Sequence, residues 1–294
     1  MYPTSRAATP STSLLVIPSN SKLLEESITS HGDSIVTIFF GCKPKIQPFL
    51  VVNGKNNRKR LLYSFLFRNF APEVTKKLRN MKIKAIITGD IVRSEQIALD
   101  KRDLLIKVLR DIVANLQKIS PMKMEMFRGD SFQIVVECPE TSLKIASMIR
   151  AGLKSYSPTD AKEVWDARIS IGIGTTDYQG DSIVTSDGEA FKLSGRGLDA
   201  MEKNRLAVST CWHDVNEELD AGLAFADDLI TGWSVNQAKV IYLSVAQELS
   251  QTVIANIIEK SQQNVSKTLT SAKESLLVRF LKRFETIIIK HKEL

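Results

Sequence analysis

Two periods of hydrophobic residues alternate along the middle of the chain, and together they predict a mixed α+β fold. Short β-branched runs bounded by Gly, Pro or Asp are typical of strands. Apolar residues that recur every three or four positions are typical of helices that bury one face. This βαββαβ order predicts a ferredoxin-type sandwich, with helices packed on one face of a sheet. The predicted order is strand 82–89, helix 97–118, strands 124–128 and 131–137, helix 140–154 and strand 167–174.

Helical periodicity returns near the C-terminus and predicts an all-α arm over residues 233–294. Residues 251–270, QTVIANIIEKSQQNVSKTLT, contain two short apolar faces separated by a polar break. The sequence after them, SLLVRFLKRFETIIIKH, predicts one longer amphipathic helix. Its apolar stripe either packs within the chain or pairs two chains into a homodimer. The inner-face residues of the two short helices are Ile254, Ala255, Ile258, Val265 and Leu269.

The first 80 residues show neither period in sustained form. They begin with a Ser/Thr/Pro-rich run and contain the basic cluster KNNRKR at 55–60, which suits nucleic-acid binding or a localisation signal. Met81 stands directly before the first strong strand. We therefore interpret 1–80 as a basic N-terminal extension, either disordered or a mis-assigned start upstream of Met81. The expected domains are 1–80, 81–232 and 233–294.

Composition narrows the class of protein. The chain has 294 residues, of which 43% are hydrophobic and 25% charged, as in ordinary globular proteins. No apolar run reaches the roughly 18 residues that a membrane-spanning helix needs. The three cysteines leave an odd one, and the three histidines form no zinc-ligand spacing with them. These features predict a cytoplasmic protein without a membrane partner.

The net charge of +7 is unevenly distributed. Lys and Arg outnumber Asp and Glu by 12 to 4 over residues 1–80 and by 9 to 5 over 237–294, whereas residues 81–236 carry 19 against 24. Basic ends suit a polyanionic partner, although a solvated basic face is the plainer explanation.

Two aspartates follow strand-like runs in the same Gly-Asp context. KAIITGD ends in Gly89 and Asp90, and MEMFRGD ends in Gly129 and Asp130 at the tip of a predicted hairpin. Carboxylates on rigid strand ends are the ligands that Mg²⁺ or Mn²⁺ takes beside phosphate oxygens. The alternative is turn chemistry alone, since Gly-Asp is also a common hairpin pair.

The order of elements and these motifs resemble the palm-like catalytic domain of class III nucleotidyl cyclases and, more closely, the cyclase-related SatD-like bacterial proteins. The resemblance spans about 81–232. It implies that Asp90 in TGDIVRS and Asp130 are the two metal aspartates, with Gly129 and Arg128 beside a bound nucleotide. It also implies that GEAFKLSGR supplies phosphate or transition-state contacts from Gly188, Lys192 and Arg196.

The chain departs from the cyclase pattern where purine cyclases select the base. Met126 stands where a base-selecting Lys is found, Thr185 stands for the later acid, and Lys192 replaces an Asn. The run ISIGIG lacks the spacing of a nucleotide loop, so we interpret it as a central strand whose glycines admit close packing.

Residues 251–270 resemble the helix-turn-helix of sigma-factor-type regulators. Glu259 replaces the Gly often found in the turn, and Lys260 replaces an apolar residue. An ordinary αα-hairpin is the alternative. The residues that would face a DNA major groove are Gln262, Gln263, Asn264, Ser266, Lys267 and Thr268.

Two functions remain open from the sequence. The first is a DNA-binding transcriptional regulator whose cyclase-like domain senses a nucleotide or phosphate ligand, favoured by the missing base-selecting residues and the basic arm. The second is a metal-dependent nucleotidyl cyclase or small nucleotide polymerase, favoured by Asp90, Asp130 and Arg196.

Overall fold

The computed structural model describes residues 24–29, 35–40, 82–127, 129–158, 164–176 and 187–293. The chain forms two units, Met1–Asn56 and Asn57–Leu294. In the first unit, β1 (Leu24–Thr29) and β2 (Ile35–Phe40) pair antiparallel. The predicted N-terminal extension therefore contains a pair of strands, while its basic cluster 55–60 and Met81 lie outside the described residues.

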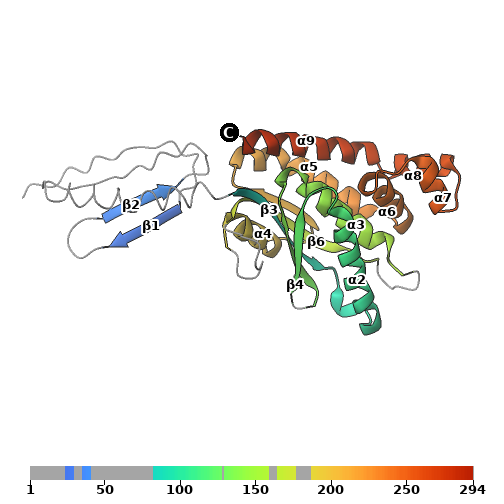
Figure 1. The fold of residues 1–294 in the computed structure, drawn as a ribbon, viewed down its shortest axis with the longest axis horizontal. Helices are drawn as coiled ribbons and strands as arrows, with labels where there is room; N and C mark the ends of the chain where they lie inside the picture. Colours follow the sequence, from blue (N-terminus) through green and yellow to red (C-terminus); the bar gives the residue numbers. More distant parts are fainter. Residues whose placement is uncertain are drawn as a thin grey trace, which may run out of the picture. The chain divides into compact units, whose positions relative to one another are not determined.

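The second unit begins with the predicted βαββαβ order, which the structure confirms (Figure 1). Each boundary lies within a few residues of the one that the periodicity predicts. Short 3-10 turns, η1 (Ser94–Gln96) and η2 (Pro139–Thr141), precede the two helices. The elements are β3 (Lys82–Ile91), α2 (Leu99–Leu116), β4 (Met122–Phe127), β5 (Ser131–Val136), α3 (Ser142–Ser155) and β6 (Ala167–Thr176).

The sheet has the strand order β4-β5-β3-β6-β7. The first four strands pair antiparallel, and β7 (Leu206–Thr210) runs parallel to β6 after a crossover through α4 (Glu189–Asp199). The sequence did not predict β7 or the long α5 (His213–Gly232) that follows it. At five residues, β7 is too short to show a period of its own.

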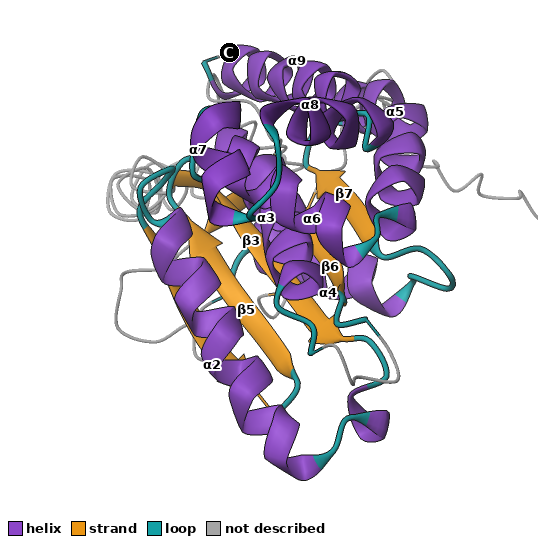
Figure 2. Ribbon diagram, turned by 90° about the vertical axis from the view of Figure 1, so that its right-hand side faces the viewer, coloured by secondary structure: helices purple, strands orange, loops and turns teal. Residues whose placement is uncertain are grey.

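The two faces of the sheet are covered by different helices. Ala85, Ile87 and Ile171 belong to a large core shared with α2, α3 and α5, whereas Ile86 and Val135 pack with Ala190 of α4 on the other face. Figure 2 shows α2 and α3 lying over the strands. The alternation of side chains along each strand produces this division.

Helix α4 lies unusually close to β6. A Cβ atom at Gly172 would stand 2.1 Å from the carbonyl oxygen of Ala190 and 2.5 Å from the backbone nitrogen of Ser194. The absence of a side chain at Gly172 therefore permits this contact, as expected for the ISIGIG strand.

The C-terminal arm consists of four short helical segments and one long helix, which pack on the sheet domain. They are α6 (Val235–Ile241), a π-helical turn η3 (Tyr242–Ala246), α7 (Gln251–Ile257), α8 (Gln262–Ser271) and α9 (Glu274–Lys292). Their buried residues belong to the same core as α3 and α5, so the core is continuous across residue 233.

Helix α9 lies along α5, as Figure 1 shows, and buries most of its apolar stripe within the chain. Of the two alternatives for this stripe, the structure supports intramolecular packing. No helix among the described residues is both long enough and apolar enough to cross a bilayer. The buried stripe residues are Leu277, Leu281, Phe284, Ile287 and Ile288.

Candidate functional site

Asp90 lies near the end of β3 on the face that α4 covers, directly opposite Arg168 of β6. The two side chains form a bidentate ion pair. Arg168 Nε donates to Oδ1 of Asp90 at 2.9 Å, and Nη2 donates to Oδ2 at 2.5 Å. These hydrogen bonds raise the pKa of Arg168 above its ordinary value. Both carboxylate oxygens of Asp90 are therefore engaged by one guanidinium group.

Asp130 lies at the tip of the β4–β5 hairpin. Gly129, which precedes it, has a φ of 82°, a conformation that favours glycine at this turn. Ser94 Oγ donates to Oδ2 of Asp130 at 2.7 Å, and Ser131 Oγ donates to Oδ1 at 3.3 Å. The carboxylate thus ties the hairpin tip to the segment after β3.

The two aspartates lie at the same end of the sheet. Asp90 is paired in register with Ser131, the residue after Asp130. The backbone nitrogen of Ile91 donates to the carbonyl oxygen of Asp130 at 3.0 Å. The structure therefore brings together the two strand ends that the Gly-Asp pattern singles out.

A divalent metal ion at this arrangement would have to displace Arg168 from Asp90. Both oxygens of Asp90 bind the guanidinium of Arg168, which competes with a metal ion for them. Each oxygen of Asp130 accepts one hydrogen bond from a hydroxyl group and keeps a lone pair for a metal ion. A cation beside the guanidinium of Arg168 would also be repelled. Among the described residues, no group of three or more His, Cys, Asp or Glu side chains could hold a metal.

The predicted contacts on α4 do not join the aspartate pair within one chain. Gly188 pairs with Thr176 at the far end of β6, roughly 26 Å along the strand from Arg168. Lys192 is exposed and pairs with Asp187 at 3.3 Å.

Arg196 is also exposed. Helix α4 contacts the sheet through other residues. Ser194 Oγ accepts a hydrogen bond from Thr88 Oγ1 at 2.9 Å, and Gly197 packs against Ser170. Because residues of a helix are spaced about 100° apart, Arg196 and Lys192 face away from the sheet.

Two residues of this site escaped the sequence analysis. Arg168 stands at the start of ARISIGIG, a strand to which the sequence assigned no chemistry, and only the strand register reveals its partner. Ser94 follows TGDIVR and shows no signal beyond its place in that motif. Arg128 and Thr185 lie outside the described residues, and Met126 pairs in register with Phe132.

Helices α7 and α8 form the tight pair that residues 251–270 predict. Their inner faces are buried at Ile254, Ala255, Val265 and Leu269. Glu259 lies in the turn with a φ of 54°, the left-handed conformation for which Gly is the usual residue.

The outer face of α8 is polar. Ser261 caps the helix by accepting from the backbone nitrogen of Asn264 at 3.2 Å. The side chains of Gln262, Gln263 and Lys267 are exposed and make no hydrogen bond or ion pair with any described residue. Of the remaining predicted DNA-facing residues, Asn264 and Ser266 are exposed and Thr268 is half-buried.

Comparison with solved structures finds cyclase domains. A bacterial light-regulated adenylyl cyclase aligns with a TM-score of 0.36 and 13% identity, over 59% of this chain and 59% of that one. The active GGEEF domain of a diguanylate cyclase from Vibrio cholerae aligns with a TM-score of 0.32 and 20% identity, over 52% of this chain and 96% of that domain. The aligned part thus spans about three fifths of the adenylyl cyclase.

At these scores the likenesses carry no conclusion about activity. No protein-family model matches the sequence, and no curated protein matches it.

Proposed function

We propose that this protein is a DNA-binding transcriptional regulator in which α8 enters the major groove and the cyclase-like domain binds a nucleotide or other phosphate ligand. The observation that carries the proposal is the α7–α8 pair. It consists of two short helices with buried inner faces, a tight turn, and an outer face whose amides and one lysine are exposed. Helix-turn-helix proteins present the N-terminal residues of their second helix to the bases.

The residue types on α8 suit that role. Gln262, Gln263 and Asn264 carry amides that pair with adenine in the major groove, and they stand in the first turn of the helix. Lys267 and the N-terminal end of α8 suit backbone phosphates. The cluster of exposed amides at one helix end supports the proposal over an αα-hairpin that serves packing alone.

The test measures the fluorescence anisotropy of labelled, short random-sequence DNA duplexes mixed with the full chain. The salt concentration is raised in steps. Wild-type protein is expected to bind at low salt and to lose affinity steeply as salt rises. Lys267→Gln is expected to reduce the slope of log K against log salt by about 1. Lys118→Gln, which removes an exposed lysine after α2, is the matched control and should leave the slope unchanged.

Two results would contradict the proposal. One is the absence of binding at low salt by a folded sample. The other is a salt slope that Lys267→Gln and Lys118→Gln change equally, since unspecific charge would then explain the binding.

The second candidate function is a metal-dependent nucleotidyl cyclase or small nucleotide polymerase. The observation that favours it is the meeting of Asp90 and Asp130 at one sheet end. The Arg168 ion pair and the outward direction of Lys192 and Arg196 weigh against it, unless a homodimer supplies these groups from a second copy.

Mass spectrometry after incubation with mixed nucleoside triphosphates and Mg²⁺ or Mn²⁺ separates the two functions. Cyclic or oligomeric nucleotide made by the wild type and not by Asp130→Asn would establish the enzyme. A regulator is expected to leave the triphosphates unchanged.

A further inference from the structure

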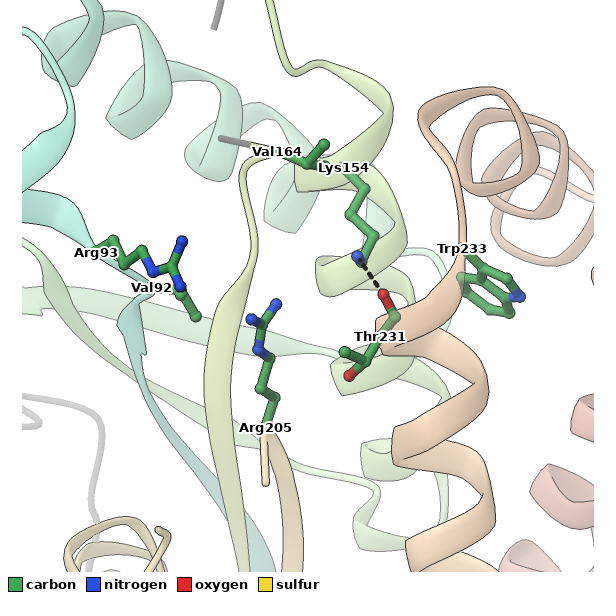
Figure 3. Close-up of a pocket in the computed structure, with 7 residues that line it drawn as sticks. All are labelled: Val92, Arg93, Lys154, Val164, Arg205, Thr231 and Trp233. Atoms are coloured by element: carbon green, nitrogen blue, oxygen red, sulfur yellow. Dashed lines mark hydrogen bonds between the residues drawn. The ribbon is translucent and has the colours of Figure 1, made fainter. Parts of the chain in front are cut away.

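A basic cavity of about 300 Å³, lined by neither Asp90 nor Asp130, lies where the last turns of α3 and α5 meet the segments after β3 and before β7 (Figure 3). Its lining includes Arg93, Lys154 and Arg205, while no Asp or Glu of the described residues lines it. Small-molecule sites commonly begin at this size. Lys154 and Arg205 present N–H groups to this space, which suits an anionic occupant.

A buried ionic cluster behind the cavity fixes two of these cations, Lys154 and Arg205. Arg150, fully buried in α3, donates to Oδ1 and Oδ2 of Asp166 from Nε and Nη2, both at 2.9 Å, and to Asp227 from Nη1 at 2.6 Å. Asp166 also accepts from Arg205 Nη1 at 2.9 Å. The carboxylates therefore hold the cationic side chains from behind.

The charges of this cluster do not balance. Arg150, Lys154 and Arg205 supply three positive charges, and Asp166 and Asp227 supply two negative ones. One positive charge remains among these five described groups, and two of the cations, Lys154 and Arg205, line the cavity. A bound anion would neutralise it.

Lys154 and Arg205 keep donors for a ligand. Lys154 Nζ donates to the carbonyl oxygen of Thr231 at 3.1 Å and lies 3.6 Å from Asp166 Oδ2. Nε and Nη2 of Arg205 make no hydrogen bond with any described residue.

Lys154 is also costly to keep charged in this position. Its side chain is only 4% exposed. Burial lowers the pKa of Lys154, and attraction to Asp166 opposes that effect only in part. An anion in the cavity would favour the charged form and make a further hydrogen bond to it.

We propose that this cavity binds a phosphate group, either as free phosphate or as the monoester of a small molecule. The fork of N–H groups on Arg205 matches phosphate oxygens, and the buried ammonium of Lys154 supplies a second fixed charge. The site is distinct from the aspartate pair, because Asp90 lies on the α4 face of the sheet. The proposal does not depend on DNA binding.

Isothermal titration of the full chain at constant ionic strength tests the proposal, with inorganic phosphate, ribose 5-phosphate and malonate as probes. Phosphate or ribose 5-phosphate is expected to bind one site, and the tighter of the two identifies the source of the group. Arg205→Gln is expected to weaken that binding about 10- to 100-fold. Lys203→Gln, an exposed lysine in the same loop, is the matched control and should bind like the wild type.

Further variants keep the test decisive. Lys154→Gln should also weaken binding, and Arg205→Lys, which keeps the charge but not the fork, should fall between Arg205→Gln and the wild type. The Asp130→Asn protein should bind phosphate like the wild type. The Lys267→Gln protein should also bind phosphate like the wild type, even if it no longer binds DNA. Failure of both phosphate probes to saturate one site on folded protein would overturn the proposal. Equal binding of malonate, or unchanged binding by a folded Arg205→Gln protein, would do the same.

Discussion

Removal of Arg150 is the most informative test of what holds the sheet domain together. Arg150 connects α3 to Asp166 before β6 and to Asp227 of α5, and its Nη2 also donates to Thr231 Oγ1 at 2.7 Å. It is fully buried. Arg150→Met keeps much of the side-chain volume but leaves two buried carboxylates without their main partner.

The expected loss follows from the burial of those carboxylates. Removal of one partner from a buried ion pair costs about 3–5 kcal/mol, because an uncompensated charge remains. Asp166 keeps the backbone nitrogen of Ala167 and the guanidinium of Arg205, which places the estimate inside this range rather than above it. For a domain of this size, the melting temperature should fall by roughly 6 to 20 °C.

The loss should depend on pH in a defined direction. Burial by itself would raise the pKa of Asp166, but hydrogen bonds from Arg150 and the nearby cations outweigh it, so the pKa is lowered. A lowered folded-state pKa contributes stability above the unfolded pKa of about 3.9, and this contribution is lost as pH falls through the folded value. The gap between wild type and Arg150→Met should therefore be widest at neutral pH and narrow below about pH 4.

Urea unfolding followed by circular dichroism measures both effects. Arg279→Met, at an exposed position of α9, is the matched control and should change stability by less than about 0.5 kcal/mol. Asp166→Asn added to Arg150→Met should recover part of the loss, because it removes one uncompensated charge. A loss below about 1 kcal/mol, or one equally large at neutral and acidic pH, would refute the reasoning.

Two further substitutions test the α4 face of the sheet. Gly172→Ala places a Cβ against the backbone of α4 and should cost about 1–3 kcal/mol in urea unfolding, whereas Gly195→Ala, which meets nothing within 4 Å, should be neutral or slightly stabilising. Arg168→Met should free Asp90 and increase the affinity for Mn²⁺ in calorimetric titration. Arg168→Met/Asp90→Asn should show no such gain, and equal Mn²⁺ binding by both proteins would contradict the inferred role of the ion pair.

The periodicity of the sequence was sufficient for the first six elements of the sheet domain, because each one buries a regular face. It did not reveal β7, which has five residues and depends on β6 for its pairing. It also missed α5, although Val215, Leu219, Leu223 and Ile230 are buried at helical spacing along it. Their spacing is a helical signal that the sequence does contain.

The candidate sites also differ in whether they depend on neighbouring residues or on residues far apart in the sequence. Asp90 and Asp130 are predictable because each stands in a local Gly-Asp pair at the end of a strand-like run. The partnership of Asp90 with Arg168 depends on the register of two strands, and the residues are separated by 78 positions. The basic cavity is lined by Lys154, Arg205 and Thr231, which come from separate parts of the chain, so no local sequence pattern predicts it.

The cavity and the proposed DNA-reading helix share a physical connection. Trp233 lines the cavity, and its indole Nε1 donates to the carbonyl oxygen of Ala272, the C-terminal cap of α8, at 3.0 Å. A phosphate group that shifts Trp233 would act on the C-terminal end of α8, and coupling to DNA requires that this shift change the DNA affinity of the helix. Because coupling between two binding sites is reciprocal, DNA would then change the affinity for phosphate by the same factor. A regulator whose ligand enters this cavity needs no catalytic metal, which agrees with an Asp90 carboxylate that Arg168 already neutralises.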